Sequence, residues 1–391
     1  MGRLFQPLSS GNGPLSPEPR GRSESLYDFL KRSDWPESAR ARDLLEDWLA
    51  RCPPGCREDL ASRLKKKRHH SDSAFFELYL HELLVQIGYV AEPHPALKSR
   101  ATRPDFRVTG THANDAFYME AAVIEPTDDQ VRAHNYTNRL LDALDDVGDP
   151  NFGLEVTIRG ERPTSTIKAE PILASLREWL AKLDPDEVAR LRTADAELVP
   201  EWAEHIGGLR LMIRPIPWPK GARGSKRRAV MIFWCEFSYG VWKKIRGAIQ
   251  AKAKRYGDLG APFIIALNCC IDFGFEHYDV AQALFGQESL GVKVGDAFRE
   301  VKIMRKPNGV WRGPEGPRNS QVSGLLLFSQ IISPWTVAEA QPYLILHPKP
   351  DFPFLSSQWC LSVRDVGTRE IHEGKPIHEV LGLERGWPKN P

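Results

Sequence analysis

The chain reads Pro104-Asp105-Phe106-Arg107-Val108 and, after a short polar segment, Phe117-Tyr118-Met119-Glu120-Ala121-Ala122. Both stretches have the apolar, β-prone composition of strands, and residues 110–115 between them have the composition of a turn. We therefore expect two adjacent strands, with Asp105 opening the first and Glu120 within the second. Their carboxylates would then converge at one end of a hairpin. The alternative is that both are ordinary solvated charges at strand ends.

A predicted helix precedes these strands and carries a third acid. Apolar residues recur at helical spacing from Phe75 to Ile87, and Glu77 lies within that segment. Hard cations such as Mg²⁺ take oxygen ligands, usually one or two carboxylates together with water and substrate phosphate. Glu77, Asp105 and Glu120 are therefore candidate metal ligands. For Glu77 the alternative is a simple pair with a neighbouring base.

A helix with an acid, a strand opened by Pro-Asp and a glutamate in the next strand together resemble the PD-(D/E)XK, or restriction-endonuclease-like, nuclease superfamily. The resemblance covers about residues 72–160, where Asp105 matches the motif aspartate, Glu120 the second acid and Glu77 the acid of the preceding helix. It implies a mixed central sheet flanked by helices, and metal-dependent hydrolysis of phosphodiester bonds with Mg²⁺ or Mn²⁺. The family pattern has a lysine two residues after the second acid, whereas this chain has Ala122. Either the lysine has moved or the site is inactive.

A later predicted helix, at about residues 239–256, offers a substitute lysine. Its apolar stripe continues through Lys252, whereas Lys254 falls on the opposite face. Burying an unpaired amine costs several kcal/mol or forces it neutral, so we expect Lys252 to meet Glu120 or Asp105. There it would orient the nucleophile or stabilise the charged phosphate. The alternative is that its long stem extends across the core to water.

The charge of the chain is nearly balanced, with 53 Lys and Arg against 51 Asp and Glu. Basic residues are concentrated in two runs, residues 65–70 and 220–228. Such runs bind phosphates through counterion release, so we expect a nucleic-acid partner, DNA first and RNA second. The alternative is a solvated linker. The predicted nucleic-acid contacts of the second run are Lys220, Arg223, Lys226, Arg227 and Arg228.

Length and composition limit the remaining possibilities. The 391 residues suffice for one large or two ordinary domains. No apolar run approaches the roughly 20 residues of a membrane helix, and the first residues lack a signal-peptide core, so we expect a cytoplasmic protein without a membrane partner. Of six cysteines only Cys52 and Cys56 are closely spaced, and a zinc site would need a second ligand pair. We expect buried or incidental thiols.

The predicted organisation is an α/β protein with additions at both ends. We expect a disordered tail at residues 1–24, a helical extension at 25–70, a nuclease-like α/β core with an insertion at 71–275, and a C-terminal extension with additional strands at 276–391. Within the core, a strand at 152–158 should follow a helix at 127–147 and rejoin the sheet.

The sequence thus favours a metal-dependent nuclease acting on DNA or RNA. The competing hypothesis is a catalytically inactive nuclease-like module for nucleic-acid binding or assembly, which Ala122 supports. A third is an unrelated α/β scaffold that binds no divalent ion.

Overall fold

The computed structural model describes residues 3–5, 16–18, 25–66, 68–97, 102–112, 115–124, 128–161, 163–224, 229–236, 241–269, 277–294, 299–328, 330–365 and 371–389. The chain divides into two compact units. One comprises residues 1–125 with 240–391, and the other residues 126–239.

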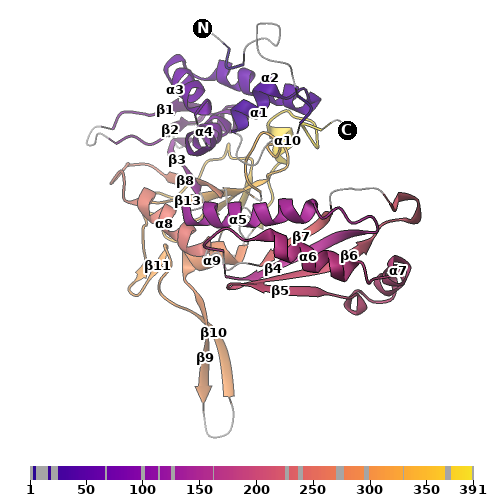
Figure 1. The fold of residues 1–391 in the computed structure, drawn as a ribbon. Helices are drawn as coiled ribbons and strands as arrows, with labels where there is room; N and C mark the ends of the chain where they lie inside the picture. Colours follow the sequence, from indigo (N-terminus) through magenta and orange to yellow (C-terminus); the bar gives the residue numbers. More distant parts are fainter. Residues whose placement is uncertain are drawn as a thin grey trace. The chain divides into compact units, whose positions relative to one another are not determined.

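The first unit is built on a mixed eight-stranded sheet (Figure 1). In spatial order its strands are β1 (Val90–Pro93), β2 (Phe106–Thr109), β3 (Phe117–Ile124), β8 (Phe263–Cys269), β13 (Gly324–Phe328), β14 (Pro342–Leu346), β15 (Ser362–Asp365) and β16 (Ile371–His372). Strands β1 to β3 pair antiparallel, whereas β3, β8 and β13 pair parallel. Every residue of β8 and β13 is buried, as expected for strands covered on both faces.

Helices cover both faces of β3. The helices of this unit are α1 (Leu26–Arg32), α2 (Pro36–Arg51), α3 (Pro54–Leu64), α4 (Arg68–Ile87), α8 (Val241–Ala253), α9 (His277–Phe285) and α10 (Ile377–Val380). Phe117, Met119 and Ala121 of β3 belong to the same hydrophobic core as the apolar residues of α4. Glu120 instead meets the end of α8. Because successive strand residues point to opposite faces, α4 and α8 lie on opposite sides of β3.

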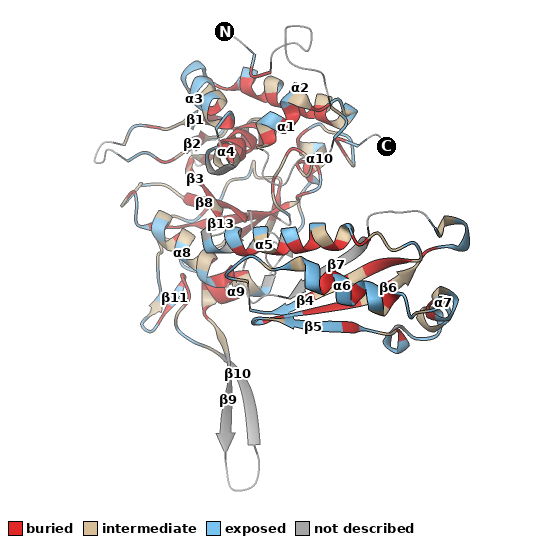
Figure 2. Cartoon of the chain, in the orientation of Figure 1, coloured by how far each residue is buried: buried red, intermediate tan, exposed pale blue. Residues whose placement is uncertain are grey.

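The N-terminal helices and the sheet share one core. That core joins residues of α1, α2, α3 and α4 to residues of β2, β3, β8, β13 and β14. Buried residues accordingly dominate α4 and the central strands, whereas α2 and α3 bury only one side (Figure 2). The helical extension predicted for residues 25–70 therefore packs as part of this unit.

Two small antiparallel hairpins complete the first unit. They are β9 (Glu288–Val294) with β10 (Arg299–Arg305), and β11 (Arg312–Gly313) with β12 (Gly316–Pro317).

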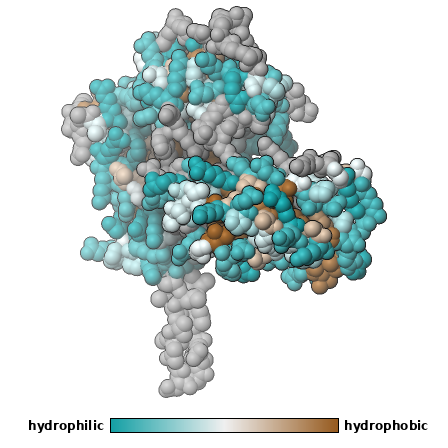
Figure 3. All heavy atoms as spheres, in the orientation of Figure 1, coloured by the Kyte–Doolittle hydropathy of each residue, from teal (hydrophilic) through white to brown (hydrophobic). Residues whose placement is uncertain are grey.

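The second unit has its own sheet and its own core. Its strands run in the order β5 (Trp202–Ile206), β6 (Leu209–Pro217), β4 (Phe152–Gly160) and β7 (Val230–Glu236). Its helices are α5 (Asp128–Asp145), α6 (Ala169–Leu180), α7 (Pro185–Ala194) and the 3-10 turns η2 (Ala196–Leu198) and η3 (Lys220–Ala222). Hydrophobic surface is visible over this unit in Figure 3, and Leu198 in it is 59% exposed.

Most predicted elements are confirmed, but one assignment is wrong. The hairpin of Asp105 and Glu120 forms, with Phe106 opposite Met119 and Arg107 opposite Tyr118. The predicted strand at 152–158 also forms, but as β4 it pairs with β6 and β7 in the second sheet. The order of elements along a chain does not specify which sheet a strand joins. The place beside β3 is taken by β8, which follows α8.

The segment expected to be a disordered tail lies mostly outside the described residues. Of its described residues, Leu4 and Phe5 are buried, and Phe5 N donates to Glu46 Oε1 at 2.7 Å. Ser16 forms a bridge with Ser33. Throughout the described parts of the chain, no helix combines the length and apolar character that a membrane crossing requires.

Candidate active site

Asp105 and Glu120 are brought together by the register of β2 and β3. Asp105 immediately precedes β2, and its backbone N donates to Glu120 Oε2 at 3.2 Å. In return Ala121 N donates to Asp105 Oδ2 at 2.7 Å. Asp105 O also accepts from His94 N at 2.9 Å, where the chain leaves β1 in the uncommon left-handed conformation (φ 47°). The predicted convergence of the two carboxylates is confirmed.

The Glu120 carboxylate is 1% exposed and accepts hydrogen bonds at both oxygens. Oε1 accepts from Lys252 Nζ at 2.5 Å and from Arg255 Nη1 at 3.2 Å. Oε2 accepts from Tyr256 Oη at 2.6 Å as well as from Asp105 N. Two cations and two neutral donors therefore offset the cost of burying this charge.

The last turn of α8 and the residues just after it supply three of these four donors. Lys252 lies on its buried face as predicted, and its contact with Glu120 is confirmed. Lys254 is exposed. The sequence analysis did not assign Arg255 or Tyr256 to the site. Tyr256 follows Lys252 by four residues, a spacing that would put both on one face of the predicted helix, and this was the available signal. In the structure α8 ends at Ala253, so Tyr256 reaches Glu120 from the segment after the helix.

The exposure of the three donors differs. Tyr256 is 2% exposed, while the side chains of Lys252 and Arg255 are 25% and 46% exposed. Burial, followed by the hydrogen bond to Glu120, raises the pKa of the Tyr256 hydroxyl above its usual range. Tyr256 is thus a buried neutral donor, whereas the two cations are partly exposed.

Asp105 carries the most consequential pKa shift of the site. Its carboxyl is raised to a pKa of about 8, first by desolvation and then by the charges of Glu120 and Glu77. The hydrogen bond from Ala121 N and the charge of Lys252 act in the opposite direction. The raised pKa favours the protonated carboxyl group near neutral pH, and a cation beside it would favour loss of that proton.

Glu77 lies on α4 and is held by a different set of partners. Arg63 of α3 donates Nη1 to Glu77 Oε1 at 2.9 Å and Nη2 to Oε2, which makes a bidentate pair. Ser73 Oγ donates to Oε1 at 3.2 Å. The hydrogen bond to Glu77 raises the pKa of the Arg63 guanidinium. Glu77 thus acts on Asp105 through its charge, while both of its oxygens are engaged by Arg63.

The site has oxygen donors suited to a hard cation, but in this arrangement they are engaged. Among the described residues no three His, Cys, Asp or Glu side chains gather closely enough to hold a metal ion. Asp105 is the best placed ligand, because Ala121 N is its one hydrogen-bond donor within the described residues. A metal ion there would require Asp105 to lose its proton and Glu120 to release a donor, of which Lys252 and Arg255 are the exposed ones.

The predicted nucleic-acid contacts of residues 220–228 lie in the second unit. Lys220 Nζ is 3.3 Å from Asp186 Oδ2, and Arg223 Nη2 is 2.8 Å from Asp186 Oδ1. These pairs lower the pKa of Asp186, most strongly through Arg223. Lys226, Arg227 and Arg228 lie outside the described residues. Part of the positive charge of this run is therefore already shared with an acid.

Four of the six cysteines, Cys52, Cys56, Cys269 and Cys360, form no disulfide within the described residues. Cys52 Sγ lies 3.6 Å from His81 Nδ1 in the core beside α4. Cys52 and Cys269 are buried, whereas Cys56 and Cys360 are partly exposed.

Comparison of the chain with protein-family models, with curated proteins and with solved structures finds no match.

Proposed function

We propose that this chain is a metal-dependent nuclease with a restriction-endonuclease-like core, which hydrolyses phosphodiester bonds of DNA or RNA at Asp105 and Glu120. The observation that carries the proposal is the ion pair between Lys252 and Glu120 at 2.5 Å. It places a lysine from a helix 132 residues later beside the second acid of the strand pair, which is what a displaced motif lysine requires.

The protein's own groups divide the chemistry between them. Asp105 and Glu120 would hold the cation, and Glu77 would support its binding through its charge. Mg²⁺ or Mn²⁺, when bound, would polarise the phosphate and lower the pKa of a bound water. Lys252 and Arg255 would turn from Glu120 to the phosphate, where their charges stabilise the developing negative charge. Tyr256 would keep Glu120 in position through its buried hydroxyl.

The raised pKa of Asp105 supports this division of roles. Two carboxylates placed side by side repel each other, and here the repulsion is relieved by a proton on Asp105 and by two cationic side chains on Glu120. A divalent cation would relieve the same repulsion. Perturbed pKa values of this kind concentrate at functional sites, although structural networks produce them too.

A second candidate is the inactive module for nucleic-acid binding or assembly. The observation in its favour is that each carboxylate oxygen of Glu120 already accepts two hydrogen bonds, and two of the four donors are cationic. In that case the cluster would be structural, with Lys252 in place of a metal ion. The two candidates differ in whether Asp105 binds a divalent ion.

The decisive experiment is incubation of the purified full-length protein with single- and double-stranded DNA and RNA and with Mg²⁺ or Mn²⁺. We expect cleavage by the wild-type protein and none in EDTA. The Lys254→Met variant is the matched control, because this lysine is exposed and lies two residues after Lys252, just past the end of α8. Nucleic-acid binding without cleavage or divalent-ion binding would favour the inactive module.

A further inference from the structure

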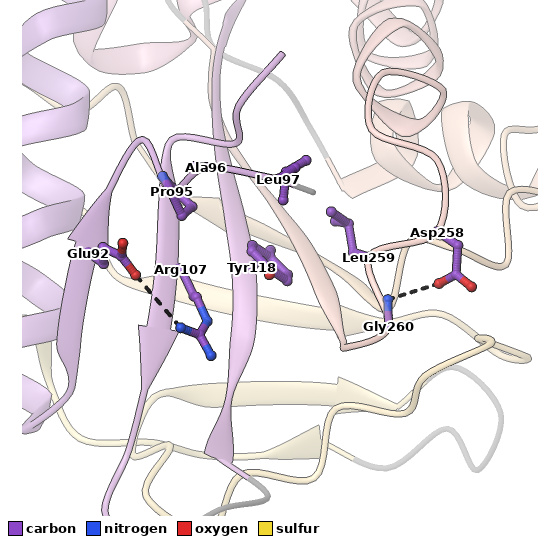
Figure 4. Close-up of a pocket in the computed structure, with 9 residues that line it drawn as sticks. All are labelled: Glu92, Pro95, Ala96, Leu97, Arg107, Tyr118, Asp258, Leu259 and Gly260. Carbon is purple, nitrogen blue, oxygen red and sulfur yellow. Dashed lines mark hydrogen bonds and ion pairs between the residues drawn. The ribbon is translucent and has the colours of Figure 1, made fainter. Parts of the chain in front are cut away.

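A pocket of about 530 Å³ opens on the sheet beside the proposed site (Figure 4). Its volume is within the range of sites that hold small molecules or single groups of larger ones. The strand register fixes its position. Glu92 of β1 lies opposite Arg107 of β2, and Arg107 lies opposite Tyr118 of β3, so the three form one row across the sheet.

This row is the neighbour of the row that holds the two carboxylates. Tyr118 precedes Glu120 by two residues, so both point to the same face of β3, roughly 7 Å apart along the strand. The opposite border of the pocket is the turn 258–260, which follows the helix that supplies Lys252. A strand of nucleic acid with its phosphate at Glu120 and Lys252 would therefore have its next nucleotide at this pocket.

The walls of the pocket suit the flat face of a base. Pro95, Leu97 and Leu259 line the pocket, and Tyr118 lies between Pro95 and Leu259 in the view of Figure 4. Bases stack on aromatic side chains without regard to sequence, because every base has a π face. A base within a duplex has both faces covered by its neighbours, so only an unpaired base can be stacked in this way.

The charges of the pocket favour a base over a phosphate. It contains two carboxylates, Glu92 and Asp258, and one guanidinium, Arg107. Arg107 and Glu92 are 3.8 Å apart and about half exposed, which makes their pair weak. Asp258 accepts from Gly260 N at 2.8 Å, and this bond shapes the turn. The carboxylates can accept from the amino groups of a base, whereas a phosphate would meet net negative charge.

We propose that this pocket, the Tyr118 pocket, binds one unpaired base next to the phosphate that the proposed site cleaves. The substrate is then a single-stranded nucleic acid, or an end or loop with unpaired nucleotides. This inference rests on the proposed nuclease function, since that function places the phosphate at Glu120 and Lys252.

The test measures binding separately from cleavage. Oligonucleotides carrying the fluorescent base 2-aminopurine are titrated with the full-length protein in EDTA, as single strands and as duplexes. We expect preference for the single strand and a change in 2-aminopurine emission on stacking. Tyr118→Leu should weaken single-strand binding on the order of tenfold and abolish the emission change, whereas Tyr118→Phe keeps the ring and should bind like the wild type.

Two further variants protect this test from a folding artefact. Leu259→Glu places a charge in the opposite wall on a partly exposed turn, and it should weaken single-strand binding as well. Tyr278→Leu changes a tyrosine that is 50% exposed on α9 and does not line the pocket, so it should bind like the wild type. Thermal melting verifies that each variant is folded.

The outcomes separate this inference from the proposed function. Equal affinity for duplex and single strand, or unchanged binding by both Tyr118→Leu and Leu259→Glu, overturns the Tyr118 pocket even if the protein cleaves duplexes. Cleavage restricted to single strands and reduced by Tyr118→Leu supports both. If the emission change is seen and depends on Tyr118 but no substrate is cleaved, the pocket stands as a base-binding site and the nuclease function fails.

Discussion

Glu77 and Glu120 are both buried carboxylates that the sequence predicts as metal ligands, yet their surroundings are opposite in kind. Glu77 is held at both oxygens by one guanidinium, that of Arg63, with Ser73 adding a third bond. Glu120 is held by separate donors from two elements and lies beside a second carboxyl, Asp105, with a pKa near 8. The charge of Glu77 is therefore matched by Arg63 without any bound ligand, whereas Glu120 and Asp105 form a pair of acids held side by side.

The two carboxylates show what separates a structural ion pair from a reactive one. A bidentate pair fixes geometry and leaves no repulsion to be relieved. Two adjacent carboxyl groups hold a proton or bind a cation, and the groups that offset their charge here are partly exposed. We therefore expect activity to depend on the Glu120 cluster and stability to depend on Glu77. The predictions below test that division.

The largest effect is expected from the two carboxylates of the strand pair. Asp105→Asn and Glu120→Gln should each lower cleavage by more than roughly a hundredfold, since even groups one layer away from a metal contribute about 10–100-fold. The fold should persist, because Lys252 and Arg255 are able to turn to water. Rates with Mg²⁺ and Mn²⁺ measure the loss, with Lys254→Met as the control. Cleavage at the wild-type rate by either variant would place the metal site elsewhere.

A smaller but still large loss is expected from the lysine on α8. Lys252→Met keeps most of the stem and should reduce the rate of cleavage by roughly a hundredfold, the lower range for removing one stabilising donor. Substrate affinity should change much less. The comparison is with Lys254→Met, which should behave like the wild type. If both variants cleave equally fast, Lys252 is a structural counterion of Glu120, just as Arg63 is of Glu77.

The reverse result is expected for Glu77. Glu77→Gln breaks a buried pair and leaves Arg63, 20% exposed, without its main partner. The free energy of unfolding should fall by about 3 kcal/mol, the lower end for removing one member of a buried pair. Urea unfolding at pH 7 measures this. A variant as stable as the wild type but unable to cleave would make Glu77 a metal ligand after all.

Local patterns were sufficient to predict the parts of the site that depend on neighbouring residues. Alternation placed Asp105 and Glu120 on paired strands, and the apolar stripe of α8 placed Lys252 toward the sheet. For Lys252, the cost of burying an unpaired amine predicts that it meets a carboxylate. The same stripe reaches Tyr256, whose hydrogen bond to Glu120 was not predicted.

Other features depend on contacts between elements distant in sequence, which no local pattern specifies. The Arg63–Glu77 pair requires that α3 pack against α4, and Arg63 resembles any other arginine in a polar helix. The separate sheet of β4 to β7 follows from pairing between distant strands. The extension of the main sheet by β13 and β14 arises in the same way, since strand composition does not identify a strand's neighbours.

The raised pKa of Asp105 predicts that the stability of the folded protein depends on pH, and that Asp105→Asn removes this dependence. Between pH about 4 and about 8 the folded protein holds a proton on Asp105, whereas the unfolded chain, with the ordinary value of 3.8, does not. The folded state binds more protons in that window, so this group makes stability fall as pH rises, by up to about 1.4 kcal/mol per pH unit, with no further loss above pH 8. Urea unfolding of wild type and Asp105→Asn from pH 5 to 9 measures the difference in slope. Parallel slopes would refute the assignment.

The same proton offers a direct measure of metal binding. If Mg²⁺ or Mn²⁺ binds Asp105 at pH 7, up to about one proton should be released for each ion bound. Calorimetry in two buffers with different enthalpies of ionisation counts this proton. Asp105→Asn should neither bind the ion nor release the proton. Ion binding without any proton release would point to other ligands.

The smallest effects are expected from residues 220–228, the basic run of the second unit. Its ion pairs are exposed to solvent, unlike those of Glu77 and Glu120. Asp186 is about half exposed and shares Lys220 and Arg223, which are therefore only partly available to phosphates. Replacing Lys220, Arg223, Lys226, Arg227 and Arg228 together by glutamine should weaken binding to all sequences alike. Each lost phosphate contact lowers the slope of log affinity against log salt by about 0.7 for single strands and 0.9 for duplexes.

Asp186 divides the positive charges of the run into two groups, because it pairs with Lys220 and Arg223. Glutamine at Lys220 and Arg223 alone should reduce the salt slope less than glutamine at Lys226, Arg227 and Arg228, since the first two charges are already partly offset by Asp186. Asp186→Asn should act in the opposite direction and strengthen binding by releasing them. Affinities of one oligonucleotide at several salt concentrations provide the measurement.

An unchanged slope in the five-residue variant would show that residues 220–228 are a solvated connector. Nucleic acid would then be held by the first unit alone, where Lys252 and Arg255 are the cations nearest to Glu120.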